Sequence, residues 1–145
     1  MNLEIISQLN ESQVQDLVQL YQSTWWGQGR TLEDVHKMLQ HSDIIIGINN
    51  PDNQKLIGFA RVLTDYVYRA VIWDVMIDAA YQKQGLGQTL IQSILDHPQL
   101  QSMEAFLLVC LPEIIPFYEK LGFTSDVGKL KLMKCVKSSS SYDSI

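Results

Sequence analysis

A turn with two glycines, Tyr81-Gln82-Lys83-Gln84-Gly85-Leu86-Gly87, has the residue types and the setting of a phosphate-binding site. The apolar run at 71–77 before it predicts a buried β-strand. After it, apolar residues recur at helical spacing until Pro98 ends the pattern. The first N–H groups of such a helix have no partner inside the helix, and the helix dipole adds about half a positive charge there. We therefore expect the turn to bind a pyrophosphate through its main-chain N–H groups.

Two common nucleotide-binding motifs do not fit this turn. The dinucleotide pattern G-x-G-x-x-G requires a third glycine at position 90, where the chain has Leu90. The triphosphate P-loop requires Gly-Lys followed by Ser or Thr, and no such sequence follows the turn. The pattern that remains is Q-x-x-G-x-G, which runs from Gln82 to Gly87.

This pattern resembles the acetyl-CoA-binding signature of the GNAT superfamily of N-acetyltransferases. Further along, Pro-Phe-Tyr-Glu-Lys-Leu-Gly-Phe at 116–123 is similar to a helix and turn late in that fold, and a strand-like run at 105–110 lies between the two motifs. Two motifs in this order and at this distance make the resemblance specific. A weaker similarity, through I-W-D-V at 72–75 and the turn itself, is to serotonin N-acetyltransferases of the plant and cyanobacterial type.

The resemblance implies an α/β (α+β) GNAT fold, in which a single mixed, largely antiparallel sheet of six or seven strands is combined with about four helices. Two parallel strands of that sheet would splay apart at the cofactor site. We expect residues 3–136 to form the acetyltransferase domain and the polar tail at 137–145 to be disordered. The chain pattern places strands at 3–9, 43–48, 56–64, 70–78, 104–110, 122–127 and 129–136. It places helices from residue 10 or 12, from a cap at Thr31, after the glycine turn, and at 113–121.

The resemblance also implies acetyl-CoA as co-substrate, with no metal. Main-chain groups of the turn would hold the pyrophosphate, and Lys83 could add a charge-assisted contact. Main-chain groups at the end of the preceding strand would pair with the pantetheine arm as an added strand does. The expected cofactor-binding residues are Val75, Met76, Ile77, Gln82, Lys83, Gln84, Gly85, Leu86, Gly87, Gln88 and Tyr118.

Tyr118 occupies the position of the family's usual general acid, which protonates the thiolate of coenzyme A as it leaves. A phenol with a pKa of about 10 suits a thiolate whose conjugate acid has a pKa of about 8.5–10. A few residues earlier many relatives carry Asn, whereas this chain has Leu111 and Pro112. The chain therefore departs from the family at one side-chain contact to coenzyme A.

Asp74 is a carboxylate inside an apolar strand, where a charge needs a partner. A hairpin that turns near Val67 would place Arg61 almost opposite Asp74 and allow a buried ion pair. Alternatively, Asp74 acts with Tyr81 on the amine, as a general base or an orienting carboxylate. An alkylamine with a pKa of about 10 needs about 4–5 kcal/mol to be presented neutral at pH 7. Several amine-acetylating relatives have an acidic residue at the matching position, so Asp74 joins Tyr118 as a candidate catalytic residue, and both interpretations stay open.

Trp25, Trp26 and Arg30 lie in a glycine-flanked loop between the first two predicted helices. In the family this loop forms one wall of the acceptor pocket. The two indoles could stack on an aromatic or aliphatic amine, or they could anchor the loop to the core. Together with Asp74 and Tyr81, these three residues are the expected substrate-binding set.

We therefore predict an acetyl-CoA-dependent N-acetyltransferase. Its acceptor would be a primary amine of a small molecule, with an arylalkylamine as one option, and the amine would attack the thioester directly. Two alternatives are an enzyme that acts on protein amino groups and a non-catalytic module that senses acyl-CoA.

Composition argues against several other classes. A length of 145 residues suits one domain, and a net charge of −5 argues against a nucleic-acid-binding surface. No apolar run approaches the roughly 20 residues that span a membrane, and the first residues lack the features of a signal peptide. Cys110 and Cys135 lack metal-ligand spacing. We expect a cytoplasmic protein, and a homodimer is one option.

Four lysines form a basic stripe near the C-terminus: Lys129, Lys131, Lys134 and Lys137. The stripe suits a solvated strand edge, because lysines discourage pairing with other chains. A weak contact with a phosphate of coenzyme A is the alternative.

Overall fold

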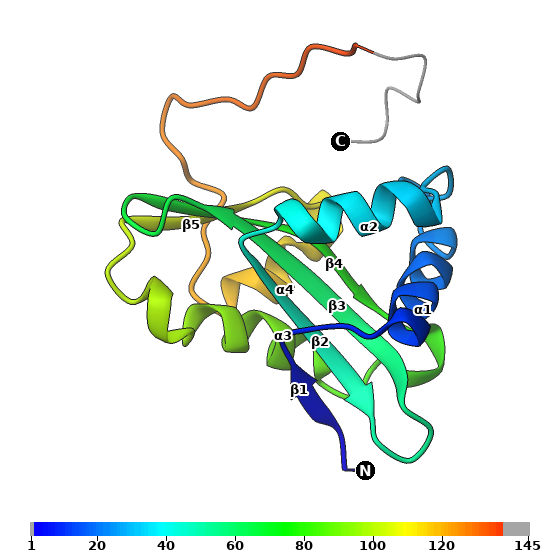
Figure 1. Ribbon diagram of the computed structural model, residues 1–145. Coiled ribbons are helices and arrows are strands. Elements are labelled where there is room, and N and C mark those ends of the chain that lie inside the picture. The colour runs from blue at the N-terminus through cyan, green and yellow to red at the C-terminus, as the bar shows by residue number, and fades with distance from the viewer. Residues whose placement is uncertain (1, 138–145) are drawn as a thin grey trace.

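Figure 1 shows the computed structural model of the chain, which describes residues 2–137. One five-stranded sheet has the order β1-β2-β3-β4-β5. The first four strands pair antiparallel with their neighbours, and β5 joins β4 in parallel. The strands are β1 (Glu4–Ile6), β2 (Ile44–Asn50), β3 (Lys55–Thr64), β4 (Arg69–Ile77) and β5 (Ala105–Leu108).

Helices cover both faces of the sheet. On one face Leu17 and Tyr21 pack against Phe59, and on the other Ile91 and Tyr118 belong to the larger apolar core. Because the central strands are buried on both sides, β3 is a nearly continuous apolar run. No helix of the described residues is long and apolar enough to cross a membrane. The α-helices are α1 (Glu11–Gln22), α2 (Leu32–His41), α3 (Leu86–Leu95) and α4 (Ile115–Glu119).

The first two helices start where the capping residues predicted. Asn10 Oδ1 accepts a hydrogen bond of 2.9 Å from the N–H of Gln13, and the Gln13 side chain accepts one of 2.9 Å from the N–H of Asn10. This capping box satisfies two N–H groups at the start of α1. Thr31 Oγ1 likewise accepts from the N–H of Asp34 at 3.2 Å. The predicted helix starts are confirmed.

The prediction of six or seven strands is wrong for the last two. The segments 122–127 and 129–136 form no strand, and Leu130, Leu132 and Met133 are 76%, 66% and 90% exposed. The alternating pattern supplies β-propensity, but a strand forms only where a neighbour takes up its hydrogen bonds, and none of the described strands pairs with this segment. The lysine stripe therefore does not lie on a strand edge. The tail predicted to be disordered comprises residues 137–145, and all of them except Lys137 lie outside the described residues.

The helix predicted at 113–121 is divided into two shorter pieces. A 3₁₀ turn, Pro112–Ile114, leads into α4. Pro116 stands in the first turn of α4, where a helix needs no N–H donor, so the proline is accommodated without a broken bond. The result is a short helix that carries Phe117 and Tyr118.

Strands β4 and β5 separate near the middle of the sheet. Their pairing starts at Arg69 and Ala105 and ends at Ile72 and Leu108, although β4 continues to Ile77. The splayed parallel pair implied by the resemblance is therefore present. Beyond Ile72, none of the described strands pairs with β4 on the β5 side.

Candidate active site

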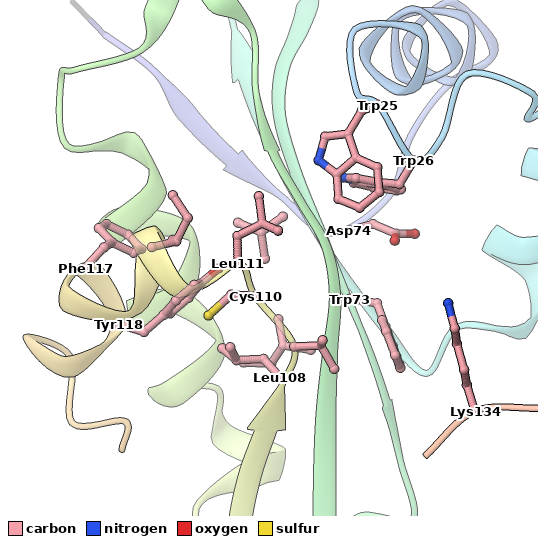
Figure 2. Close-up of a pocket in the computed structure, with 14 residues that line it drawn as sticks. Trp25, Trp26, Trp73, Asp74, Leu108, Cys110, Leu111, Phe117, Tyr118 and Lys134 are labelled. Atoms are coloured by element: carbon pink, nitrogen blue, oxygen red, sulfur yellow. The ribbon is translucent and has the colours of Figure 1, made fainter. Parts of the chain in front are cut away.

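A cavity of about 840 Å³ lies where β4 and β5 separate. Residues 72–75 of β4 and residues 108–111 line it, together with Phe117 and Tyr118 of α4 (Figure 2). Trp25 and Trp26 line it from the loop after α1. Most of these side chains are aromatic or aliphatic, so the cavity suits an apolar or aromatic group.

A second cavity of about 270 Å³ lies at the N-terminus of α3. Ile77 and Tyr81 line it, as do most residues of the glycine turn. Phe117 lines both cavities, so the two adjoin along β4. An elongated ligand could therefore lie with one end at the glycine turn and the other between β4 and β5.

The glycine turn has a backbone that leaves its amides available. Lys83 and Gly85 adopt φ values of +65° and +79°, and Gly85 is the N-cap residue of α3 without any side-chain cap. No described residue accepts a hydrogen bond from the N–H groups of residues 83–88. A run of unpaired N–H groups at a helix N-terminus is an anion site.

The two glycines of the turn are needed for different reasons. Gly85 adopts a left-handed conformation that is costly for any residue with a Cβ atom, although space around it is open. At Gly87 a Cβ atom would lie 3.3 Å from Cζ of Phe117, which lines both cavities. Gly85 therefore sets the backbone path, and Gly87 allows α4 to approach α3.

Tyr118 lies in the wall of the larger cavity and is only 8% exposed. Its ring packs edge-on against Phe117 and Phe123, with centroids 5.0 and 5.7 Å apart. Burial, with a smaller contribution from Cys110, raises the pKa of Tyr118 to about 12. The phenol therefore stays protonated, and remains a hydrogen-bond donor, through the physiological pH range.

Asp74 sits on a β-bulge in β4. Phe59 pairs with Met76 and Arg61 with Trp73, so two residues of β4 face one residue of β3 between these pairs. Asp74 has a φ of +58°, a left-handed conformation that aspartate tolerates better than most residues. A bulge of this kind redirects a side chain and interrupts the ladder of hydrogen bonds.

Three donors hold a single oxygen of Asp74. Arg61 Nε and Arg30 Nη1 each lie 2.7 Å from Asp74 Oδ2, and Tyr21 Oη donates to the same oxygen at 2.8 Å. The Asp74 side chain is only 5% exposed. Burial first, and then the negative charge of Asp74, raises the pKa of Tyr21. The buried ion pair predicted between Asp74 and Arg61 is confirmed, and Tyr21 and Arg30 complete it.

The two neighbouring tryptophans differ in their contacts. Trp26 packs edge-on against Tyr21 at 5.8 Å, and the guanidinium of Arg30 lies 5.1 Å from its ring. Trp25 is 53% exposed and faces the larger cavity. Trp26 therefore anchors the loop, whereas Trp25 is available to a ligand.

Arg30 and Tyr81, two of the expected substrate-binding residues, are engaged by other residues of the chain. The Arg30 side chain is engaged with Asp74 and the Tyr21 ring, at 4.6 Å from the ring centroid. Tyr81 accepts a hydrogen bond of 3.0 Å from Asn50 and lines the smaller cavity, whereas Asp74 lines the larger one. The structure therefore does not bring Tyr81 to Asp74.

The three strand residues expected to contact the pantetheine group lie in different surroundings. Val75 lines the larger cavity and Ile77 the smaller, but Met76 is buried in the core under α1. The carbonyl of Ile77 accepts a hydrogen bond of 3.1 Å from the Gln82 side chain. That carbonyl can serve a ligand only by sharing or exchanging this bond.

Two site residues carry no signal in the sequence. Tyr21 fits the apolar stripe of α1 and so reads as a core residue, yet its hydroxyl bonds to Asp74. Cys110 shares the larger cavity with Tyr118, although its position in a strand-like run indicates only packing. Both residues enter the site through contacts between distant parts of the chain.

The sheet has one pair of parallel strands that separate, and beside them lies a turn whose N–H groups are unpaired among the described residues. This combination is typical of an acyltransferase. The model of the acetyltransferase (GNAT) family matches residues 12–123. The chain belongs to this family and is an acetyltransferase by class.

Two curated relatives are similar in sequence. One is the uncharacterized N-acetyltransferase ycf52 of Porphyra purpurea, 36% identical over 120 residues, which cover 81% of this chain and 68% of the relative. The other is the chloroplastic GCN5-related N-acetyltransferase 1 of Arabidopsis thaliana, 30% identical over 108 residues, which cover 74% of this chain and 55% of the relative. Because that relative is chloroplastic, a cytoplasmic location of this chain stays a prediction.

A solved structure is similar over the whole domain. It is a GNAT-family acetyltransferase, described as putative, from Xanthomonas campestris pv. campestris. The TM-score is 0.76 and the identity 25%, over 92% of this chain and 94% of the other. The GNAT fold predicted from the sequence is confirmed.

Proposed function

We propose that the protein transfers the acetyl group of acetyl-CoA to a primary amine of a small molecule. The observation that carries this proposal is the pair of adjoining cavities: a turn of unpaired N–H groups at one end and a buried phenol at the other. The unpaired N–H groups suit a diphosphate, and the buried phenol suits a leaving thiolate.

The chain offers a fitting place for the co-substrate. The N–H groups of residues 83–88 would hold the pyrophosphate, and Lys83 is among the residues that line the same cavity. The open main chain of β4 beyond Ile72, with Val75 in the cavity wall, would take the pantetheine arm as an added strand. Acetyl-CoA supplies the activated thioester.

In this proposal Tyr118 assists the departure of the thiolate. With a pKa of about 12, Tyr118 is a weaker acid than a thiol of pKa about 8.5, so complete proton transfer is unfavourable in the empty site. We therefore assign Tyr118 a hydrogen bond that strengthens as charge grows on sulfur. The sulfur ends with one proton, and the acetylated nitrogen loses one through water, so the reaction balances.

Asp74 then serves to position the site, not to accept a proton. One of its oxygens already accepts three hydrogen bonds, and Figure 2 shows the carboxylate turned away from Tyr118 and Cys110. The ion pair fixes the bulge, which in turn sets the direction of the neighbouring main-chain groups. The amine would reach the thioester neutral, after losing its proton to water.

The acceptor side favours a small apolar amine. Trp25 and Trp73 line the larger cavity, and an aromatic wall can stack on an aryl group or a cation. A protein amino group is the second candidate, and a non-catalytic acyl-CoA sensor is the third.

The test has two arms on the full chain. Calorimetry with acetyl-CoA measures binding, and release of free thiol with a panel of amines, starting from arylalkylamines, measures transfer. Binding with turnover on small amines supports the proposal. Turnover on peptides alone would show that the enzyme acts on protein amino groups. Binding without turnover on any amine would favour the non-catalytic acyl-CoA sensor. Absence of binding would overturn the assignment of the glycine turn as the pyrophosphate site.

A further inference from the structure

The larger cavity has a single carboxylate among the described residues that line it, and this carboxylate is already paired. Arg30 Nη1 and Arg61 Nε each lie 2.7 Å from Asp74 Oδ2, and Tyr21 Oη donates to the same oxygen at 2.8 Å. The Asp74 side chain is 5% exposed. Two guanidinium groups thus face one carboxylate, so this wall of the cavity repels an ammonium group more than it attracts one.

The other ionisable side chains in the cavity wall do not accept a proton near neutral pH. Lys134 contributes an ammonium group, and Figure 2 shows it on the same side of β4 as Trp73 and Asp74, opposite Tyr118. Burial raises the pKa of the Cys110 thiol. Burial first, and then Cys110, raises the pKa of Tyr118 to about 12, so the thiol and the phenol both keep their protons. None of the described histidines lines either cavity.

Two carboxylates stand close in sequence to the cavity wall but do not belong to it. Glu113 lies on the turn before α4, and Glu119 follows Tyr118, yet both are exposed and neither lines either cavity. In the smaller cavity Lys83 is the charged residue among the described lining residues. A bound amine therefore meets cations in both cavities, and it meets no unpaired carboxylate in the described part of their walls.

These surroundings favour the uncharged form of an amine, because burial and nearby cations both disfavour an ammonium ion. An alkylamine with a pKa of about 10 is uncharged at pH 7 in only about one molecule per thousand. An amine with a pKa of about 8 is uncharged in about one molecule per ten. When no group of the protein removes the proton, the rate follows this uncharged fraction, and the site favours amines of low basicity.

We propose that the acceptor is a weakly basic primary amine on an aromatic body, and that it enters the cavity already uncharged. This inference rests on the proposed function and narrows its acceptor class. Trp25, which is 53% exposed in the cavity wall, would hold the aromatic body. The nitrogen forms a bond to the thioester carbon as the C–S bond breaks, and it then passes one proton to water while the sulfur takes up one proton.

The first test compares two amines of nearly the same shape on the full chain. The first is 2-phenylethylamine, a strong base, and the second is its 2,2-difluoro derivative, in which fluorine lowers the basicity of the nitrogen by electron withdrawal. Thiol release from acetyl-CoA measures kcat/KM between about pH 6 and about pH 10. We expect kcat/KM to rise up to the pKa of each amine and then level off, so that the break moves with the substrate. At pH 7 the fluorinated amine should have the higher kcat/KM, by at least about tenfold.

Two outcomes distinguish a failure of this inference from a failure of the proposed function. A break at the same pH with both amines would show that a group of the protein takes the proton, and it would overturn the inference while acetyl transfer to small amines stands. Absence of thiol release with every small amine would overturn the proposed function and this inference with it.

The second test removes a carboxylate that the sequence places between two residues of the cavity wall. Glu113→Gln should leave the pH profiles of both amines unchanged, and Glu119→Gln on α4 is the matched control. Both side chains are exposed, so both variants are expected to fold. A break that disappears in Glu113→Gln alone, with unchanged calorimetric affinity for acetyl-CoA, would make Glu113 a base that acts through water and would overturn the inference.

Discussion

Arg61 Nε lies 2.7 Å from Asp74 Oδ2, although Trp73 stands opposite Arg61 in the strand register. The bulge reconciles the two facts, because the left-handed backbone at Asp74, with φ of +58°, turns the carboxylate toward Arg61. Arg30 and Tyr21 bind the same oxygen. Asp74 is thus the point at which α1, the loop after it and two strands are joined beside the larger cavity.

Asp74→Asn should lower stability more than it alters the chemistry. Two guanidinium groups would lose their anion, and breaking a buried pair costs about 3–5 kcal/mol, toward the lower end here because the Arg30 side chain is 32% exposed. Denaturant unfolding measures this loss, with Asp52→Asn in an exposed turn as the control. Loss of the acidic limb of the pH–rate profile with unchanged stability would instead make Asp74 the general base.

Tyr118→Phe should lower kcat by roughly 10²–10³ and leave the affinity for acetyl-CoA unchanged, because the phenol acts on the leaving sulfur and the turn binds the pyrophosphate. The ring packing against Phe117 and Phe123 is retained in the variant. Steady-state thiol release and calorimetry measure the two quantities. Near-normal kcat would remove Tyr118 from the mechanism.

Alkaline titration should distinguish the buried tyrosines. The pKa of Tyr118 is raised to about 12, and that of Tyr21 is also raised, in both cases chiefly by burial. Because the folded pKa exceeds the unfolded value of about 10, the folded state holds the Tyr118 proton more tightly. Its contribution to stability is complete below pH 10 and is lost as the pH rises through about 12.

The measurement is the ultraviolet absorbance of tyrosinate, compared between the wild type and Tyr118→Phe. We expect the difference between the two curves to appear only near pH 12 or at the pH of unfolding. If the wild-type absorbance curve has a tyrosine titration near pH 10 that the curve of the variant lacks, Tyr118 is open to solvent.

Gly85→Ala should weaken acetyl-CoA binding through the backbone. Its φ of +79° costs a residue with a Cβ atom about 1–2 kcal/mol, which corresponds to about tenfold in affinity if the turn relaxes away from the anion-binding geometry. Gly29→Ala is the control, since that glycine has open space around it and no positive φ. Equal calorimetric affinities of the two variants would contradict the role of the turn.

Trp25 and Trp26 should respond differently to replacement by alanine. Trp25 is 53% exposed in the cavity, so Trp25→Ala should raise KM for an aromatic amine with little change in stability. Trp26 packs on Tyr21 and Arg30, so Trp26→Ala should lower the melting temperature. Kinetics over an amine series and thermal melts test the pair, and a reversed pattern would exchange the two roles.

The sequence by itself determined the local features of the site. The glycine turn, its place between a strand and a helix, and the late helix with Tyr118 follow from residues close together in the chain, because short-range periodicity and capping act over one or two turns. The ion pair of Arg61 and Asp74 could also be predicted from the sequence, since a single hairpin brings the two residues together.

Only the tertiary structure decided how the distant parts meet. Tyr21 lies 53 residues from Asp74 in the chain, and Arg30 lies 44 residues away, yet both bind its carboxylate. These contacts depend on how α1 and its loop pack on the sheet, which no local pattern encodes. For the same reason the alternating segment at 129–136 predicted a strand that the chain does not form, because pairing needs a neighbour as well as a propensity.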